Sequence, residues 1–325
     1  MKRRRSLVGL ILWPALAARS ARAQAKLPRV VLILTGDAQN TAAFSAAFTE
    51  GMQQAGQVEG RSWRLQVLLG EGEPARAAQH LKEAVASRAD VLVVGGLILA
   101  RQALEATRTI PVVVATGGNL LEAGLVQSLA RPGGNLTGIS DLADEATVKR
   151  LELTRVALPK AARVAVLSNP EFPATARIEA RVESAARQLG FAIVRAHATD
   201  RASMLRAIDG LRAAAPDALM VIGDALHTSN RRELIERASA ARLPVVFYWP
   251  GAAEMGALFS YHPDVADNFK RAAGYVDRIL RGERPGELPV QQPTRYELVV
   301  NLQVARRLGI RLPPEFLLRA DRVIE

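Results

Sequence analysis

The chain contains two copies of one alternating pattern of strands and helices, and this repeat limits the folds that it can adopt. Ser87–Gly96 (SRADVLVVGG) parallels Ala214–Gly223 (AAPDALMVIG), and Thr109–Val114 (TIPVVV) parallels Arg242–Phe247 (RLPVVF). The two matches are offset by 127 and 133 residues, far more than the period of about 20 to 50 residues of solenoid proteins. The repeat therefore predicts two related lobes.

Within each copy, short apolar and β-branched runs alternate with stretches whose apolar residues recur every three or four positions. Arg29–Thr35 is typical of a buried parallel strand, and the spacing of Phe44, Phe48 and Met52 is typical of an amphipathic helix. The first copy predicts strands at 29–35, 63–69, 91–94 and 111–115 and helices at 40–55, 74–87 and 97–107. The second predicts strands at 163–168, 191–197, 218–222 and 244–248 and helices at 174–189, 202–214 and 230–241. The predicted fold class is α/β, with two doubly wound parallel-sheet lobes.

The segment between the two copies predicts a crossing from one lobe to the other. Arg131–Asn135 (RPGGN) cannot continue a helix, so we expect a helix to end near Ala130 with Arg131 capping its carbonyls. Leu136–Ser140 then predicts a connecting strand, followed by a helix at 144–158.

Two later segments predict further crossings. A strand at 256–261 leads back to the first lobe and its helix at 264–281, and a strand at 296–300 leads away again. Three crossings make a hinge with a cleft between the lobes. We therefore expect lobe 1 to comprise residues 24–138 and 260–288, and lobe 2 to comprise residues 139–259 and 289–325.

Residues 1–23 have the three parts of a secretory signal peptide. Met1–Arg5 is cationic, Leu7–Ala18 is apolar, and Ala21–Ala23 has the small-x-small pattern of a cleavage site. The apolar run is shorter than the roughly 20 residues of a membrane-spanning helix, which favours export over anchoring. The pair Arg4–Arg5 also resembles a twin-arginine signal, so either export route fits.

Composition argues against several classes of protein. The signal segment holds six of the 43 Lys and Arg residues and no acid, which leaves 37 basic residues against 32 acidic ones without a clustered basic stripe. We therefore expect no nucleic-acid partner. The chain has no Cys, which excludes disulfides, thiolate metal sites and a lipid-modified N-terminal Cys. An exported chain without a lipid anchor stays near the cell only behind an outer membrane, which predicts a Gram-negative periplasm.

The motifs of common hydrolases and of dinucleotide binding are missing from the sequence. It has no Gly-x-Ser-x-Gly elbow and no His-Glu-x-x-His pair, and no Gly-x-Gly-x-x-Gly opens a helix after a strand. His80, His197, His227 and His262 are not spaced as metal ligands. We expect no enzymatic activity, no cofactor and no metal site.

Candidate ligand-binding residues follow from the topology. In doubly wound lobes, ligands bind beyond the carboxyl ends of the strands, where helix N-termini present free N–H groups. In the first lobe this rule selects Asp37, Gln39, Thr41, Gly95, Gly96, Thr116 and Gly117. In the second lobe it selects Ser140, Asp141, Asn169, Asp224, His227 and Tyr248.

Asp224 and Tyr248 carry the most specific of these predictions. Asp224 follows the third strand of the second copy, where the first copy has the uncharged Gly96. Its carboxylate either accepts a ligand ammonium or caps the next helix, and the pattern favours neither. Phe247–Trp249 can supply an aromatic wall for a flat ligand, and Tyr248 is a better candidate than Phe247, because alternate strand residues face opposite ways.

Five segments of the predicted mature chain carry a family pattern. They are Phe48–Gly60, Gly124–Gly138, Lys149–Leu153, Tyr275–Leu280 and Leu288–Leu302. They resemble the exported substrate-binding proteins of ABC transporters, in the family that contains the tryptophan-binding TrpX-type proteins. The chain departs from the family pattern near the expected cleft, where Asn119-Leu120 replaces Asp-Pro and Ala257 and His262 replace glycines.

The resemblance implies a type I periplasmic-binding fold and a receptor that closes two lobes around a small solute. It also implies delivery of the solute by a monomeric receptor to an ABC permease in the inner membrane. The implied ligand is an amino acid, particularly an aromatic one, and an aromatic or branched organic acid is the alternative. A ligand-sensing repressor core can share this fold, but the export signal and the missing DNA-binding helices count against it.

Overall fold

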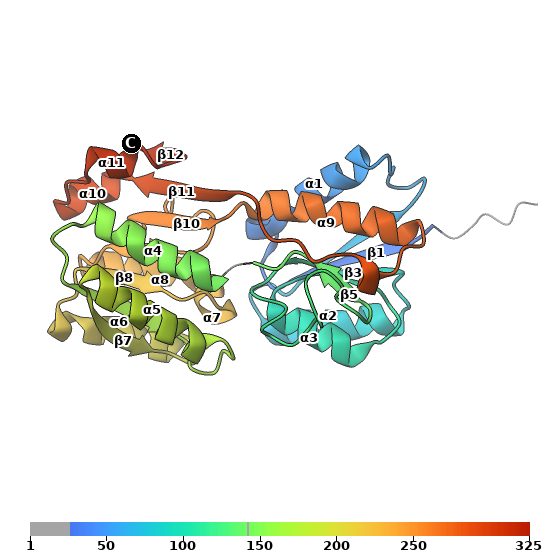
Figure 1. Ribbon diagram of the computed structural model, residues 1–325, viewed down its shortest axis with the longest axis horizontal. Helices are drawn as coiled ribbons and strands as arrows, with labels where there is room; N and C mark the ends of the chain where they lie inside the picture. The colour runs from blue at the N-terminus through green and yellow to red at the C-terminus, as the bar shows by residue number, and fades with distance from the viewer. Residues whose placement is uncertain (1–26, 142) are drawn as a thin grey trace, which may run out of the picture.

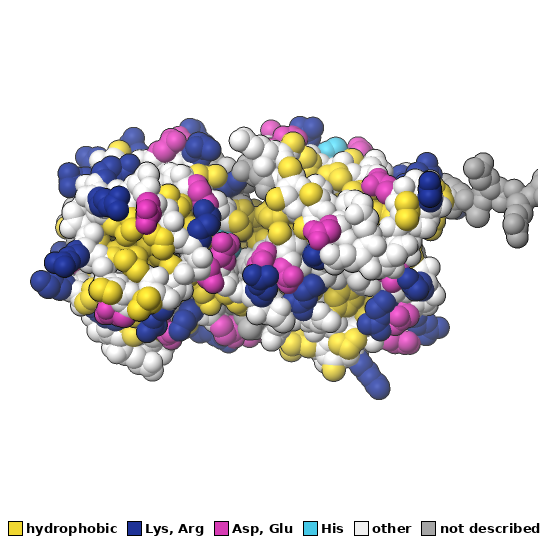
Figure 2. Space-filling model, turned by 90° about the horizontal axis from the view of Figure 1, so that it is seen from above, with side chains coloured by type: hydrophobic (Ala, Val, Ile, Leu, Met, Phe, Trp, Pro, Cys, Tyr) yellow, Lys and Arg dark blue, Asp and Glu magenta, His cyan; other side chains and the backbone are white. Residues whose placement is uncertain are grey.

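The computed structural model describes residues 27–141 and 143–325, and the predicted signal peptide lies outside these ranges. Two separate β-sheets, each with its own helices, form two lobes that lie side by side (Figure 1). No helix in the described ranges is both long and apolar enough to cross a membrane. Basic and acidic side chains are interspersed over the face of both lobes seen in Figure 2.

Lobe 1 contains a five-stranded parallel sheet in the order β2-β1-β3-β4-β5. Its strands are β1 (Arg29–Leu34), β2 (Arg64–Leu69), β3 (Val91–Gly95), β4 (Val112–Thr116) and β5 (Leu136–Gly138). The helices between them are α1 (Ala38–Gln54), α2 (Pro74–Ala86) and α3 (Leu97–Ala106).

Lobe 2 contains a seven-stranded sheet in the order β12-β11-β10-β9-β8-β6-β7. Its strands are β6 (Arg163–Ser168), β7 (Ala192–His197), β8 (Ala218–Val221), β9 (Val245–Phe247), β10 (Phe259–Pro263), β11 (Tyr296–Asn301) and β12 (Arg322–Ile324). Its helices are α4 (Ala143–Ala157), α5 (Thr175–Leu189), α6 (Arg201–Ala214), α7 (Ala225–Ser229), α8 (Arg231–Ala240), α10 (Leu302–Leu308) and α11 (Pro314–Leu317).

The first five strands of each lobe have the same order, which explains the repeat in the sequence. Strands β6 to β10 occupy the places in lobe 2 that β1 to β5 occupy in lobe 1, and all of these neighbours are parallel. Lobe 2 adds the antiparallel strand β11 and the edge strand β12. The prediction of two doubly wound α/β lobes is confirmed.

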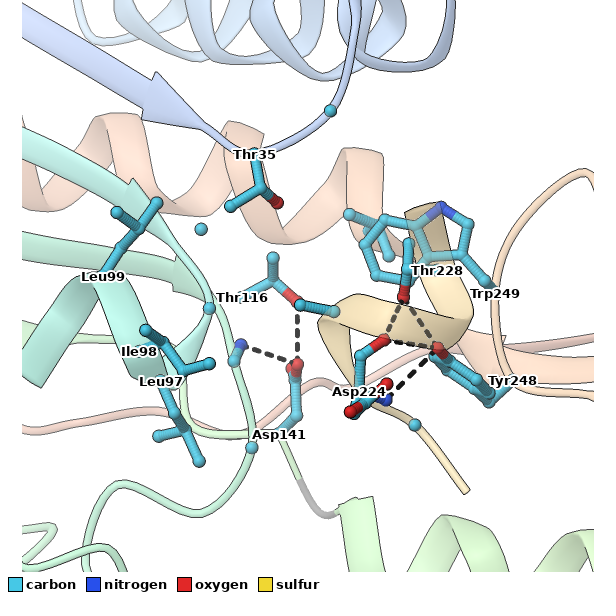
Figure 3. A pocket seen from close by; sticks show the side chains of 18 of the residues that line it. Thr35, Leu97, Ile98, Leu99, Thr116, Asp141, Asp224, Thr228, Tyr248 and Trp249 are labelled. Atoms are coloured by element: carbon cyan, nitrogen blue, oxygen red, sulfur yellow. Dashed lines mark hydrogen bonds between the residues drawn. The ribbon is translucent and has the colours of Figure 1, made fainter. Parts of the chain in front are cut away.

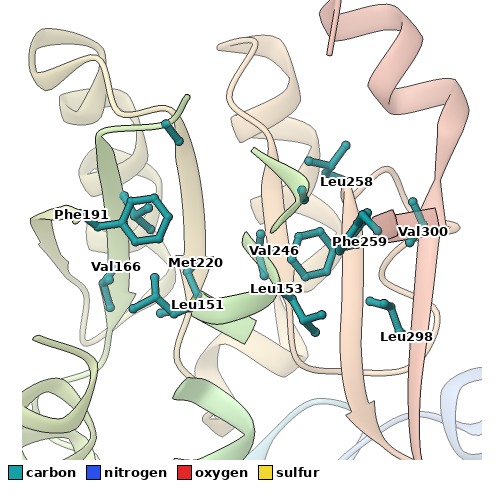
Figure 4. Close-up of a cluster of buried hydrophobic side chains, with 14 of the residues drawn as sticks. Leu151, Leu153, Val166, Phe191, Met220, Val246, Leu258, Phe259, Leu298 and Val300 are labelled. Atoms are coloured by element: carbon teal, nitrogen blue, oxygen red, sulfur yellow. The ribbon is translucent and has the colours of Figure 1, made fainter. Parts of the chain in front are cut away.

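The central strands are apolar throughout because helices cover both faces of each sheet. Val30 and Leu32 pack into one buried cluster, whereas Val31 and Ile33 pack into the cluster on the opposite face. In lobe 2, Val166 packs with Met220 and with Leu151 of α4 (Figure 4). The continuous runs thus reflect two-sided burial.

The lobes exchange helices at the hinge. After β5 the chain crosses to lobe 2 and forms α4, which packs against α5. After β10 it crosses back and forms α9 (Val265–Leu280), which packs against α1 and contacts β4 (Figure 1). The third crossing follows the short 3-10 helix η1 (Pro285–Glu287) and ends in β11. The sheet of lobe 2 is therefore covered by α4, which follows β5 of lobe 1. The sheet of lobe 1 is covered by α9, which follows β10 of lobe 2.

The crossings do not lie where the sequence placed them. Residues 260–263 belong to β10 in lobe 2, so the second crossing follows Pro263. Val290 donates to the carbonyl of Leu129 and Gln291 to that of Gly138, so the third crossing begins beyond Gln291. The segment 136–138 is no connecting strand, because it pairs with β4 as the fifth strand of lobe 1.

The helix expected to end near Ala130 does not form. Residues 117–135, all described, form turns, because glycines such as Gly118, Gly124 and Gly133 have positive φ values of 64°, 68° and 72°. Arg131 caps no helix. Its backbone N–H donates to Ser128 Oγ, which donates in turn to the Arg131 carbonyl.

We expect Gly51→Ala to weaken the attachment of α9 to lobe 1. A Cβ at Gly51 of α1 would collide with the carbonyl oxygen of Lys270 in α9, and overpacking of this kind costs about 1–3 kcal/mol of unfolding free energy. The matched control is Gly274→Ala in α9, where a Cβ meets open space and helix propensity adds about 0.5–1 kcal/mol. Urea unfolding measures both changes, and a stabilised Gly51→Ala variant would contradict this account of the packing.

Candidate functional site

A cavity of about 270 Å³ lies between the lobes at the carboxyl ends of their parallel strands. Lobe 1, lobe 2 and the segments next to the crossings all contribute residues to its lining (Figure 3). Ligand cavities are usually about 300–1,000 Å³, so this cavity suits a small solute. No group of His, Asp or Glu side chains in the described part of the chain is arranged to hold a metal ion.

Most of the predicted site residues meet in this cavity. Those that line it are Asp37, Thr41, Gly95, Gly96, Thr116, Gly117, Asp141, Asp224 and Tyr248. Four others do not belong to the lining: Gln39 is exposed, Ser140 and His227 are buried, and Asn169 bonds to Asp224. That the first nine contact a ligand remains a prediction.

Asp141 lies on lobe 1, although its position after the first copy placed it with the second lobe. One carboxylate oxygen, Oδ2, accepts from Thr116 Oγ1 at 2.7 Å and from the Gly117 N–H at 2.8 Å (Figure 3). The other, Oδ1, accepts from Asn268 Nδ2 of α9 at 3.3 Å. Burial raises the pKa of Asp141, and these hydrogen bonds offset part of the effect. Asp141 therefore ties the end of β4 to the first crossing.

Ser140 also bonds to the loop that follows β4. Its Oγ accepts from the Leu120 N–H at 3.0 Å and donates to the Gly118 carbonyl at 3.3 Å. The residues directly after β5 thus stay with the sheet of lobe 1, because their hydrogen-bond partners lie in the loop after β4.

Backbone groups of Gly96 and Gly117 form part of the wall in lobe 1. Their φ values are 102° and 151°, and a Cβ on Gly117 would lie 2.9 Å from the Gly96 backbone. Only glycine allows this approach. No side chain caps the start of α3 at Gly96, so its first N–H groups stay free beside the apolar side chains of Leu97 and Ile98 (Figure 3).

Asp224 caps the short helix α7, which was one of the two readings of this residue. Its Oδ1 accepts from the His227 N–H at 2.9 Å and its Oδ2 from Asn169 Nδ2 at 2.6 Å. Tyr248 donates its hydroxyl to the Asp224 carbonyl at 2.8 Å. Because Asp224 also lines the cavity, capping and ammonium binding do not exclude each other.

His227 lies beneath the site. Its side chain is fully buried, and Nδ1 lies 2.9 Å from the Ile222 carbonyl at the end of β8. Burial lowers the pKa of His227, and the nearby Asp224 carboxylate offsets only part of that effect. The sequence rule selected His227 because it follows a strand end, but α7 turns this side chain inward.

We expect His227→Asn to flatten the pH dependence of stability. A His with a lowered folded pKa binds its proton more readily in the unfolded chain, so stability falls as the pH drops below the unfolded value of about 6.5. Between pH 7 and 5.5 this loss is about 1 kcal/mol for one His. Urea unfolding at both pH values should show it in the wild type and in His197→Asn, whose ring is exposed. An unchanged loss in His227→Asn would contradict this assignment.

Aromatic rings from both lobes meet at one side of the cavity. Trp249, just after β9, packs edge-to-face against Phe44 of α1 with ring centroids 6.0 Å apart. Phe44 in turn stacks on Phe269 of α9 at 5.3 Å. The sequence favoured Tyr248 as the wall, and its ring does line the cavity, stacked on the buried Phe247 at 4.7 Å. Trp249 of the same stretch also lines the cavity, and its ring partner Phe44 in the other lobe could not be predicted from the sequence.

The two-lobed fold with its central cavity agrees with the comparisons to known proteins. Residues 29–324 match the family model for the ABC transporter substrate binding protein. The chain belongs to this family. A tyrosine-binding protein of Clostridioides difficile (strain R20291) is 23% identical over 269 residues, which cover 81% of this chain and 76% of the relative.

Two solved structures share the type I periplasmic-binding fold of this substrate-binding protein. A conserved domain protein from Vibrio cholerae has a TM-score of 0.84 and 28% identity, covering 92% of this chain and all of its own. An ABC domain from Streptococcus pneumoniae in complex with L-tryptophan has a TM-score of 0.83 and 21% identity over the same shares.

Three arginines that sequence reasoning missed line the cavity of the substrate-binding protein. Arg150, Arg177 and Arg231 come from helices α4, α5 and α8 of lobe 2. Two of them face acids of lobe 1: Arg177 forms an ion pair with Glu122, and the charge of Asp37 acts on Arg231. Charged residues are frequent on helices, and the sequence does not show which face of a helix turns to the cleft.

Arg150 differs from the other two because no acid among the described residues forms an ion pair with it. It is 3% exposed, and its guanidinium donates to Thr147 Oγ1 at 2.6 Å and to the Tyr261 carbonyl at 3.3 Å. Burial lowers its pKa to about 10. The guanidinium lies 5.8 Å from the ring centroid of Tyr248.

Proposed function

We propose that this substrate-binding protein is the solute receptor of an ABC importer and works in the periplasm of a Gram-negative cell. The observation that carries the proposal is the position of the cavity, whose lining comes from both lobes. A solute in that position contacts both lobes together only when they are closed, so it favours the closed form by its differential affinity. The closed form then docks on a permease in the inner membrane.

We further propose that the solute is an amino acid, particularly an aromatic one. The relatives support this choice, since one is a tyrosine-binding protein and another was solved with L-tryptophan. The cavity also combines acids, arginines and the rings of Phe44 and Trp249, which suit a zwitterion with a flat apolar side chain. An aromatic or branched organic acid is the second candidate, because the arginines favour anions.

Thermal-shift screening of the mature chain against amino acids and aromatic acids tests this function. An aromatic amino acid at about 100 times its Kd should add about 2.7 kcal/mol of stability and raise the Tm. Asp224→Asn should weaken binding of amino acids more than binding of the deaminated acids, if its carboxylate accepts the ammonium. Stabilisation only by ligands without an amino group would overturn that role, and catalytic turnover of a tightly bound ligand would overturn the receptor function.

Glu122→Gln should weaken solute binding by acting on lobe closure. Glu122 of lobe 1 forms ion pairs with Arg177 and with Arg181, the latter at 3.4 Å, and both arginines belong to α5 of lobe 2. Half-exposed pairs contribute about 0.2–1 kcal/mol, so we expect the Kd to rise by about 1.5- to 5-fold. The matched control is Glu183→Gln, whose partner Arg195 belongs to the same lobe.

Titration calorimetry at low and high salt measures this effect. The difference between wild type and Glu122→Gln should shrink at 1 M salt, where exposed charges are screened. Glu183→Gln should bind like the wild type at both salt concentrations. Equal Kd values for all three proteins at low salt would show that these ion pairs do not contribute to closure.

A further inference from the structure

The guanidinium of Arg150 has hydrogen-bonding capacity that the protein leaves unused. Of its five N–H donors, one bonds to Thr147 and one to the Tyr261 carbonyl, while Nε is buried without a partner. The titratable groups near it are the tyrosines Tyr248, Tyr261 and Tyr296, and His262, on which its charge also acts. Within the described ranges no carboxylate forms an ion pair with it. A buried ion without a counter-charge carries a desolvation penalty of several kcal/mol.

The uncompensated charge of Arg150 borders the cavity next to the crossings between the lobes. Arg150 belongs to α4, which follows the first crossing. Tyr261 lies in β10 before the second crossing, and Tyr296 begins β11 after the third. Arg150 therefore contacts or faces a residue next to each of the other two crossings.

Besides Arg150, the cavity offers apolar side chains to a ligand. Leu97 and Ile98 at the start of α3 and the ring of Trp249 line it (Figure 3), together with the ring of Phe44. A ligand that contacts both the Arg150 guanidinium and these apolar side chains needs an anionic group and an apolar body.

We propose that Arg150 binds a carboxylate of the solute and thereby restricts the receptor to carboxylates with an apolar or aromatic body. The assignment rests on the proposed receptor function of the same cavity. Carboxylates match the planar donor geometry of a guanidinium, and their charge compensates that of Arg150. Arg177 and Arg231 are less suited, because Glu122 and Asp37 already face them. The solute carboxylate then lies beside the hinge, where it compensates this charge as the lobes close.

Sets of three matched ligands test this assignment. Each set contains an amino acid, its deaminated acid and its decarboxylated amine, for example L-tryptophan, indole-3-propionate and tryptamine, with the same sets for tyrosine and leucine. The wild type should bind the amino acid of a set about 10- to 100-fold more tightly than the amine, which lacks only the carboxylate; this is the range for a hydrogen bond to a charged group. Calorimetry and thermal shift measure the ratio.

Arg150→Met should remove this preference, so that the amino acid and the amine of a set, which both carry the ammonium, bind within about twofold of each other. The unliganded variant should keep its Tm, because removing an uncompensated buried charge offsets the lost hydrogen bonds. Arg150→Lys keeps a cation and should retain part of the preference. The matched control is Lys149→Met, whose exposed side chain pairs with Glu152 and should leave every ratio unchanged.

The outcomes separate this assignment from the receptor function. If the wild type binds amines as well as carboxylates, or if Arg150→Met keeps the preference, the assignment is overturned. The second result would place the carboxylate at the free N–H groups that open α3. If only uncharged solutes bind, the receptor function stands and the assignment fails. If no solute of a wide panel of amino acids, acids, amines and sugars binds, both fail.

Discussion

The exchange of helices between the lobes is the constraint on which the rest of the structure depends. Each sheet buries one face under a helix that the chain forms only after crossing from the other lobe, α4 on lobe 2 and α9 on lobe 1. Neither lobe can complete its core without the segment beyond a crossing. The three crossings thus join packed segments of the two lobes, and we expect bending to be concentrated in the short stretches of the crossings themselves.

This arrangement also places the site. The two sheets point the carboxyl ends of their parallel strands toward the cavity, and the helices next to the crossings bring in side chains that no strand end supplies. Asn268 of α9 holds Asp141, and Arg150 of α4 lies under Tyr248. The polar groups of the cavity are thus fixed by the same segments that connect the lobes, so a bound solute acts close to the hinge.

The sequence predicts the strands of the fold well, because two-sided burial produces unbroken apolar runs such as Arg29–Thr35, and the internal repeat doubles the information. It predicts crossings less well, since strand pairing decides whether 136–138 or 260–263 joins a sheet. The strand-end rule finds backbone and loop positions such as Gly117 and Asp224. It cannot find Arg150, whose place depends on helix orientation, or the contact of Trp249 with Phe44 of the other lobe.

An arginine buried without a counter-ion is destabilising in the empty protein, and a chain selected for stability alone would replace it with an apolar residue. Its retention at the cavity follows if the missing charge arrives with the solute. The hydrogen bonds that Arg150 donates to Thr147 Oγ1 and to the Tyr261 carbonyl then serve to orient the guanidinium, since neither partner carries a negative charge. The same reasoning separates Arg150 from Arg177 and Arg231, whose charges attract lobe 1 directly. In this substrate-binding protein, acids of lobe 1 compensate two cations of lobe 2, and in our proposal the third is compensated by the solute.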